Sequence, residues 1–200
     1  VVEIGMLSAP MLNMTQVSHV RWEGLVFDLS RVDCMSLKDC DNCFVAGCTV
    51  KRFAGSGISI VGGREDGILG CDLYHLGRGA TEVTGGDRET LNPARHFVEN
   101  CLMSRFGRLD YFFVYGVELK GVGNRVAHNL FSEHPSSVLR ADGNDHVIEY
   151  NRVHRAALIA EDQGTMELFG NPTYRGVIFR YNYFSDTGVG ADMVGHAGRA

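Results

Sequence analysis

VIEYNRV, residues 147–153, is one of six copies of a single template in this chain. Each copy ends a short β-type run on a Cys or Asn and places an apolar residue two positions later. The other five copies are FVAGCTV (44–50), GILGCDL (67–73), FVENCLM (97–103), RVAHNLF (125–131) and IFRYNYF (178–184). The Cys and Asn residues, which we call the anchors, are Cys48, Cys71, Cys101, Asn129, Asn151 and Asn182. A repeat of this length predicts stacked coils.

Residues around the anchors alternate in polarity. The position three before each anchor is always apolar, whereas the position two before is mixed and often charged. This period of two predicts a strand with one inward and one outward face. Glu149 and Arg180 share the outward position in successive coils, so we expect an exposed ion pair between them. No L-x-x-L-x-L pattern occurs, and a β-sandwich has no such anchor column. The chain is therefore predicted to be all-β, a right-handed parallel β-helix of about seven coils.

A second strand is expected once in each coil. We assign these strands to residues 56–63, 79–86, 110–119, 136–143, 156–164 and 189–195. Aligning the last three places Asp142, Asp162 and Asp192 in one column, with neighbouring carboxylates ~5 Å apart because parallel strands have that spacing. The alternative is that these aspartates are turn residues.

Composition and charge limit the classes of partner. The net charge of −5 argues against binding to a nucleic-acid backbone. No apolar run approaches the ~18–20 residues of a membrane span. We expect one β-helix domain over residues 1–200. Because the chain starts at Val1 without Met and ends without a polar cap, we predict a fragment that is incomplete at one or both ends.

Six cysteines are present, and three of them occupy the anchor position that Asn takes in the other copies. They are therefore interpreted as stacked residues inside a turn. Cys40 and Cys43 form a C-x2-C pair, but no second pair at suitable spacing accompanies it, so structural thiols are favoured over a zinc site.

A column of carboxylates indicates two kinds of chemistry. Carboxyl groups ~5–5.5 Å apart are typical of a retaining glycosidase, with one nucleophile and one acid/base. The same column is alternatively a Ca²⁺ site, although no cofactor is required by the primary hypothesis. His134 precedes the strand that leads to Asp142 and is predicted to bind a sugar hydroxyl or share a proton with a carboxylate, the alternative being a structural histidine. Arg140 lies on the same face as Asp142 and could hold a carboxylated sugar, the alternative being a surface ion pair.

The second half of the chain resembles a known family. The stretches GNDHVIEYNRVH (143–154), EDQGT (161–165) and RGVIFRYNYF (175–184) are similar to the core of large secreted bacterial right-handed β-helix proteins. Those proteins are related to glycoside hydrolases that act on fucosylated or xylan-type glycans. The resemblance covers most of residues 96–190, and it implies a secreted or periplasmic protein.

The resemblance also implies roles for particular residues. Asp162 falls where such enzymes place a catalytic aspartate, whereas Thr165 and Glu167 depart from the family motif. The resemblance implies that the catalytic partner of Asp162 lies beyond Ala200. The residues alone suggest Asp142 as that partner. The predicted catalytic residues are thus Asp162, Asp142 and His134, and the predicted substrate-binding residues are Glu161, Glu167, Arg140 and Asp192.

Three functions remain open at this point. The leading hypothesis is hydrolysis of glycosidic bonds in a polysaccharide or oligosaccharide laid along the helix face. The second is a polysaccharide lyase acting on uronate-containing glycans, for which Arg140 would neutralise the acid group. The third is a non-catalytic β-helix that binds glycans or serves as a scaffold.

Overall fold

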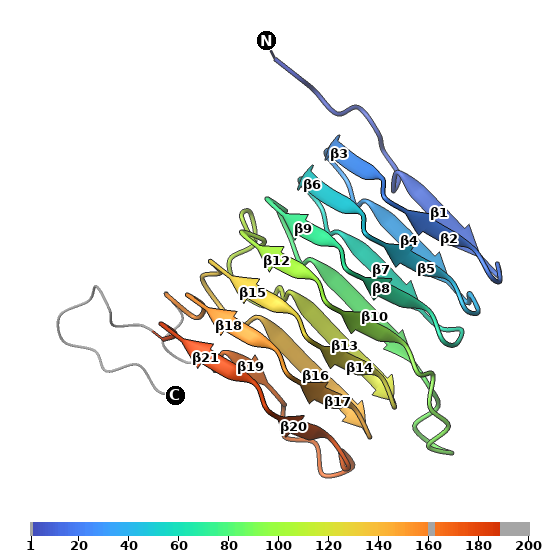
Figure 1. Cartoon of the computed structure of the whole chain (residues 1–200), viewed down its shortest axis with the longest axis vertical. Coiled ribbons are helices and arrows are strands. Elements are labelled where there is room, and N and C mark those ends of the chain that lie inside the picture. Colours follow the sequence, from blue (N-terminus) through green and yellow to red (C-terminus); the bar gives the residue numbers. More distant parts are fainter. Residues whose placement is uncertain (1, 160–162, 189–200) are drawn as a thin grey trace.

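The computed structural model describes residues 2–159 and 163–188, and every element named in them is a β-strand. Three strands recur in each coil, and strands of successive coils pair in parallel. The chain therefore winds into a column with three long sheets of seven strands each (Figure 1). The predicted all-β parallel β-helix and its seven coils are confirmed.

The three sheets share one order, with each strand beside its counterpart in the next coil. The first sheet contains β1 (Leu12–Thr15), β4 (Met35–Lys38), β7 (Ile58–Val61), β10 (Thr81–Gly85), β13 (Val117–Val122), β16 (Leu139–Asn144) and β19 (Met166–Glu167). The second sheet contains β2 (Arg21–Glu23), β5 (Phe44–Ala46), β8 (Gly67–Leu69), β11 (Phe97–Glu99), β14 (Arg125–Ala127), β17 (Val147–Glu149) and β20 (Ile178–Arg180). The third sheet contains β3 (Val26–Ser30), β6 (Thr49–Phe53), β9 (Asp72–Tyr74), β12 (Leu102–Ser104), β15 (Leu130–Ser132), β18 (Arg152–His154) and β21 (Tyr183–Ser185).

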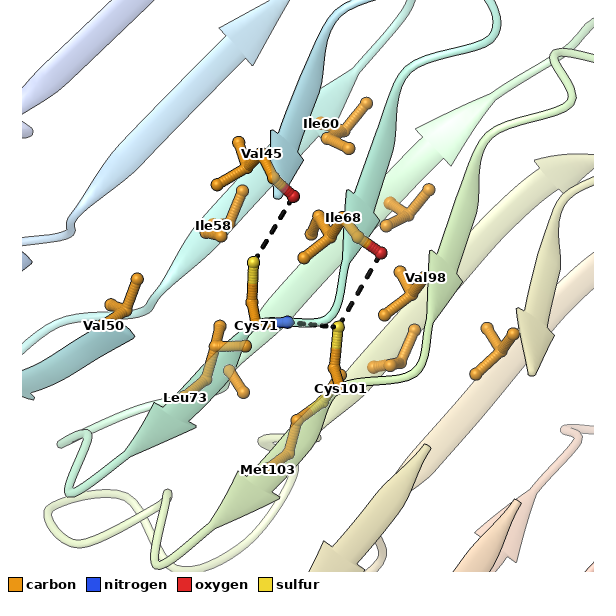
Figure 2. Packing of buried hydrophobic residues seen from close by; sticks show 14 of the residues in the cluster. Val45, Val50, Ile58, Ile60, Ile68, Cys71, Leu73, Val98, Cys101 and Met103 are labelled. Carbon is orange, nitrogen blue, oxygen red and sulfur yellow. Dashed lines mark hydrogen bonds between the residues drawn. The ribbon is translucent and has the colours of Figure 1, made fainter. Parts of the chain in front are cut away.

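The core fills the inside of the column. Positions three before the anchors face inward, as predicted, and five of them are 0% exposed: Val45, Ile68, Val98, Val126 and Ile148. They pack against apolar residues of the other two sheets, among them Ile58 and Leu73 (Figure 2). Because each coil covers the one before it, burial of these aliphatic side chains stabilises the stack by ~1.5–3 kcal/mol per fully buried residue.

The anchors form a ladder along the corner between the second and third sheets. The Asn129 backbone N–H donates to Asn151 Oδ1 at 3.0 Å, and the Asn151 N–H donates to Asn182 Oδ1 at 2.9 Å. In the coils where Cys replaces Asn, the Cys71 N–H donates to Cys101 Sγ at 3.4 Å (Figure 2). All six cysteines are buried and free, and the thiols of the three anchor cysteines take the place of amides within the turn.

A second polar ladder, which the sequence analysis missed, lies at the corner between the first and second sheets. The backbone N–H groups of Cys43, Asp66, His96 and Asn124 each donate to a side chain one coil further on. The acceptors are Asp66 Oδ1, His96 Nδ1, Asn124 Oδ1 and His146 Nδ1, at 2.8 to 3.1 Å. Because both His Nδ1 atoms accept, each imidazole carries its proton on Nε2, and burial lowers the pKa of both.

The outer face of the second sheet carries the predicted ion pair. Arg180 Nε donates to Glu149 Oε2 at 2.6 Å, which confirms the predicted pairing. The pair is not fully exposed as expected, because Glu149 is buried. Arg125 also binds Glu149 and reaches Glu99 on the other side. The two guanidinium groups hold the pKa of Glu149 below its usual value.

Two strand predictions were wrong. Residues 110–116 form a loop, and the strand starts only at Val117. The coil after β16 places its strand at Met166–Glu167, whereas residues 156–159 and 163–164 are not in a strand. Both errors come from the connection between the third and first sheets, whose length varies from coil to coil. The strand expected at residues 189–195 lies outside the described residues.

Candidate functional site: a cleft on the outer face of the first sheet

The outer face of the first sheet carries one polar column from end to end. Strand register places seven outward positions in a line: Asn13, Ser36, Ser59, Glu82, Glu118, Arg140 and Glu167. Both neighbours of Glu82 in β10 are buried, and so are both neighbours of Glu118 in β13. The two carboxylates therefore point away from the core, on adjacent strands ~4.8 Å apart.

A cleft of about 350 Å³ lies over this column. Ser36, Ser59, Glu82 and Glu118 are on its floor, and Asp33 lies at its N-terminal end. The cleft is also lined by three consecutive residues of the loop before β13: Phe113, Val114 and Tyr115. The cleft thus combines a polar floor with an apolar and aromatic wall.

The wall is held in place by contacts with the preceding coil. Gly107 and Leu109 donate backbone hydrogen bonds to the carbonyls of Arg78 and Gly77, at 2.9 and 2.8 Å. Arg78 Nε also lies 2.8 Å from Asp110 Oδ2. Phe113 has a φ of +57° and remains 68% exposed. The ring is therefore accessible to a ligand in the cleft.

Lys120 connects the two carboxylates of the floor. Its Nζ lies 2.9 Å from Glu118 Oε1 and 3.4 Å from Glu82 Oε1. Burial lowers the pKa of Lys120, but the two carboxylates outweigh this effect and the pKa is raised overall. Lys120 thus places one positive charge beside both carboxylates of the floor.

Three of the predicted site residues lie together further along the same face. Arg140 Nε donates to Asp142 Oδ2 at 2.6 Å, and its guanidinium covers the Phe169 ring at 4.2 Å. Glu167, opposite Arg140 in the register, accepts a hydrogen bond from the Tyr115 hydroxyl at 3.1 Å. Asp142 Oδ1 is buried and has no hydrogen-bond partner among the described residues. Arg140 is thus engaged by Asp142 and Phe169 rather than directed into the cleft.

His134 lies elsewhere. It is 0% exposed, its ring stacks on Phe106 at 3.9 Å, and Nδ1 donates to the Phe106 carbonyl at 3.2 Å. Burial lowers the pKa of His134 to about 4, so it is neutral at physiological pH. The expectation that His134 contacts a sugar or shares a proton with a carboxylate of the site is corrected: the residue is in the core.

The remaining predicted residues Asp162, Glu161 and Asp192 lie outside the described residues. Leu139 pairs with Met166 and Arg140 with Glu167, so the described strand beside β16 is β19. The alignment of Asp142 with Asp162 stays a prediction, because Asp162 is not among the described residues.

The site residues predicted from the sequence did not include Glu82, Glu118, Lys120 or Phe113. A usable signal was present, because TEV (81–83) and VEL (117–119) each place a Glu between two apolar residues of a strand. Alternation alone predicts that such carboxylates face outward. That they lie on adjacent coils could only be learned from the register.

No group of three or more His, Cys, Asp or Glu side chains is arranged to hold a metal ion in the part of the chain that the structure describes. Within those residues there is likewise no helix with the length and apolar character needed to cross a membrane.

Comparison with known proteins supports the fold. A family model described as a right-handed β-helix region matches residues 12–200. No curated protein matches the sequence. Among solved structures, a GH136 lacto-N-biosidase from Eubacterium ramulus is similar at 12% sequence identity with a TM-score of 0.47. The similarity covers 76% of this chain and 39% of that one.

Proposed function

The chain belongs to the right-handed β-helix family, and we propose that it is a carbohydrate-active member that binds an uncharged glycan in the cleft on the first sheet. The fold alone does not assign this function. The observation that carries the proposal is the cleft itself, which places paired carboxylates beneath an exposed aromatic ring. Binding of a glycan polymer would agree with the secreted or periplasmic location that the family resemblance implies.

The lining of the cleft suits a sugar. Hydroxyl groups of a sugar pair well with carboxylates and serine hydroxyls, which are present on the floor as Glu82, Glu118, Ser36 and Ser59. The apolar face of a sugar ring needs an aromatic or aliphatic surface, which Phe113 offers. Most ligand sites combine such apolar walls with a few polar groups that determine orientation.

The charges in the cleft favour an uncharged glycan. Three carboxylates line the cleft, those of Asp33, Glu82 and Glu118, against one lining cation, Arg78, which is paired with Asp110. Lys120 beside Glu82 and Glu118 offsets only one further charge. A uronate would therefore meet like charge, which costs binding energy. Arg140, the cation proposed to neutralise a uronate, is occupied by Asp142. The lyase hypothesis is accordingly less well supported than binding or hydrolysis of a neutral glycan.

We extend the proposal to hydrolysis at the same site. Glu82 and Glu118 are on adjacent coils, and a backbone spacing of ~4.8 Å is compatible with the ~5–5.5 Å carboxyl separation of retaining glycosidases. One carboxylate would be the nucleophile, and the other would protonate the leaving oxygen. The general acid must carry a proton, so Lys120 has to leave that carboxylate when the glycan binds. Asp162 with Asp142 remains a second proposed pair.

The test separates binding from cleavage. The chain is titrated calorimetrically with a panel of neutral and uronate-containing oligosaccharides, and the products are then analysed by chromatography. Glu82→Gln and Glu118→Gln remove one charge each from the cleft, and Glu23→Gln, on the outer face of the second sheet, is the matched control. We expect both cleft variants to weaken binding of a neutral glycan about tenfold, because Gln replaces a charge-assisted hydrogen bond (~1.5–3 kcal/mol) by a neutral one (~0.5–1.5 kcal/mol), a loss of ~1.4 kcal/mol. The control should bind normally.

The outcomes assign the activity. Cleavage that is lost in both cleft variants supports hydrolysis by this pair, while binding without cleavage leaves a glycan-binding β-helix. An unsaturated product from a uronate substrate would instead identify a lyase. Binding that is the same in the cleft variants and in the wild type would show that the glycan does not occupy this cleft.

A further inference from the structure

A second hollow lies at the corner between the third and first sheets. Its volume is about 370 Å³, and it is separate from the cleft on the first sheet. It is lined by His75, Arg105, Phe106, Gly107, Arg108, Tyr111, Glu133 and Pro135. Neither the proposed glycan cleft nor the anchor ladders use these side chains.

The backbone at this corner projects charged side chains outward from successive coils. Pairing of Tyr74 with Ser104 puts the following residues, His75 and Arg105, at the same position of neighbouring coils. Both have positive φ values, +56° and +50°. Arg108 is held beside them because its backbone N–H donates to the Leu76 carbonyl at 3.1 Å. Three basic side chains thus converge on one hollow.

The state of His75 follows from its hydrogen bond. Arg105 Nη1 lies 3.3 Å from His75 Nε2, and since a guanidinium can only donate, Nε2 must accept. The imidazole is therefore neutral, with its proton on Nδ1. Burial lowers the pKa of His75, and the charges of Arg108 and Arg105 lower it further.

One positive charge remains without a partner. Arg105 is bound by the Glu133 carboxylate, so these two groups neutralise each other. Arg108 forms no side-chain hydrogen bond or ion pair with any described residue, although it lines the hollow. The Tyr111 hydroxyl adds a neutral donor on the same lining.

We propose that this hollow binds an anionic group (a sulfate, phosphate or carboxylate), with Arg108 as its primary ligand and Arg105 and Tyr111 beside it. Guanidinium groups bind such oxyanions through paired, charge-assisted hydrogen bonds. The anion could be free or could be a substituent of a sugar. The site shares no lining residue with the neutral-glycan cleft, so either proposal can be correct when the other is wrong.

Inorganic sulfate is the first probe. The chain is titrated with sodium sulfate at ionic strength held constant with sodium chloride, and the thermal midpoint and binding heat are recorded. We expect saturable binding that Arg108→Gln weakens about tenfold, because one charge-assisted contact is lost. Arg64→Gln is the matched control, since it removes one exposed positive charge at another corner of the column. It should leave sulfate affinity unchanged.

Further titrations separate the two sources of the anion. Glucuronate and a sulfated monosaccharide are compared with their neutral parent sugars. Tighter binding of the charged sugars than of sulfate assigns the site to a substituted glycan, and the reverse order assigns it to a free anion. The proposal is overturned if sulfate gives no saturable effect beyond chloride, or if Arg108→Gln and Arg64→Gln reduce affinity equally.

Discussion

Replacing Asn151 by Leu should destabilise the column far more than the change in side-chain volume suggests. Asn151 Oδ1 accepts the backbone N–H of Asn129 at 3.0 Å, and its Nδ2 donates to the Val126 carbonyl at 3.0 Å. The residue is 1% exposed, so water cannot replace it. Leu branches at Cγ as Asn does, but its two methyl groups are larger than the amide oxygen and nitrogen, so some overpacking adds to the loss of the hydrogen bonds.

The magnitude follows from the groups that lose partners. A buried N–H without an acceptor costs ~1–3 kcal/mol, and each further lost hydrogen bond costs ~1 kcal/mol. The side-chain Nδ2 of Asn129 also donates to Asn151 Oδ1 at 3.0 Å and would lose this bond. It keeps its bond to the Val98 carbonyl, so this side-chain amide still has one partner. We therefore expect Asn151→Leu to reduce the free energy of unfolding by ~2–4 kcal/mol.

Asn151→Cys is the matched comparison, because Cys occupies this position in three other coils. Cys101 accepts from the Cys71 N–H at 3.4 Å, and its single S–H has two carbonyls in reach, Glu99 at 3.1 Å and Ile68 at 3.7 Å, so a thiol can serve both roles weakly (Figure 2). We expect a loss about half that of the Leu variant.

Urea unfolding followed by circular dichroism measures the stability of both variants. Hydrogen exchange at the Asn129 amide tests the cause directly, since this amide should lose protection in the Leu variant and keep part of it in the Cys variant. A loss below ~1 kcal/mol for Asn151→Leu, or equal losses for Leu and Cys, would refute the argument that the ladder stabilises through its hydrogen bonds.

Three further predictions concern other parts of the column. Gly121→Ala should cost at least ~2 kcal/mol in urea unfolding, because Gly121 has a φ of +99° and an added Cβ would lie 2.0 Å from the Gly85 carbonyl oxygen; a neutral effect would contradict this geometry. The folded pKa of His134 lies near 4, below its unfolded value near 6.5, so the unfolded state takes up the proton first as pH falls. Stability should therefore drop by ~3 kcal/mol between these pH values in the wild type and by less in His134→Phe, which keeps the stacking on Phe106; parallel pH profiles would count against the assignment. Phe113→Ala should weaken neutral-glycan binding two- to tenfold, as expected for loss of one aromatic contact (~0.5–1.5 kcal/mol), with an unchanged thermal midpoint because the ring is exposed; unchanged affinity would remove Phe113 from the site.

Much of the fold could be predicted because its signals are local. The apolar residue three before each anchor, such as Val98 or Ile148, marks the inward face through strand alternation alone. Asn and Cys at one repeated position indicate a turn that repeats in each coil. The second ladder could not be found in this way, because its members Asp66, His96, Asn124 and His146 differ in type and share no simple motif.

The candidate site could be predicted only in part. Two charged residues of the first sheet, Glu82 in β10 and Arg140 in β16, belong to strands that were assigned correctly. Glu118 and Lys120 in β13 and Glu167 in β19 belong to the two strands that were assigned wrongly, because the loop from the third to the first sheet varies in length. That variation placed Glu167 opposite Arg140, and Arg140 is paired with Asp142 of its own strand.

In this protein, features that depend on residues close together in the chain differ from those that depend on contacts between coils. The sequence by itself determined the parallel β-helix, the anchor ladder and the inward residues, since strand alternation and turn chemistry depend on residues close together in the chain. Only the tertiary structure decided which outward residues become neighbours, as Glu82, Glu118 and Lys120 do in the cleft and His75, Arg105 and Arg108 do in the second hollow. The physical reason is that register between coils is set by loop lengths and core packing, so residues about thirty positions apart meet only after the coils have stacked.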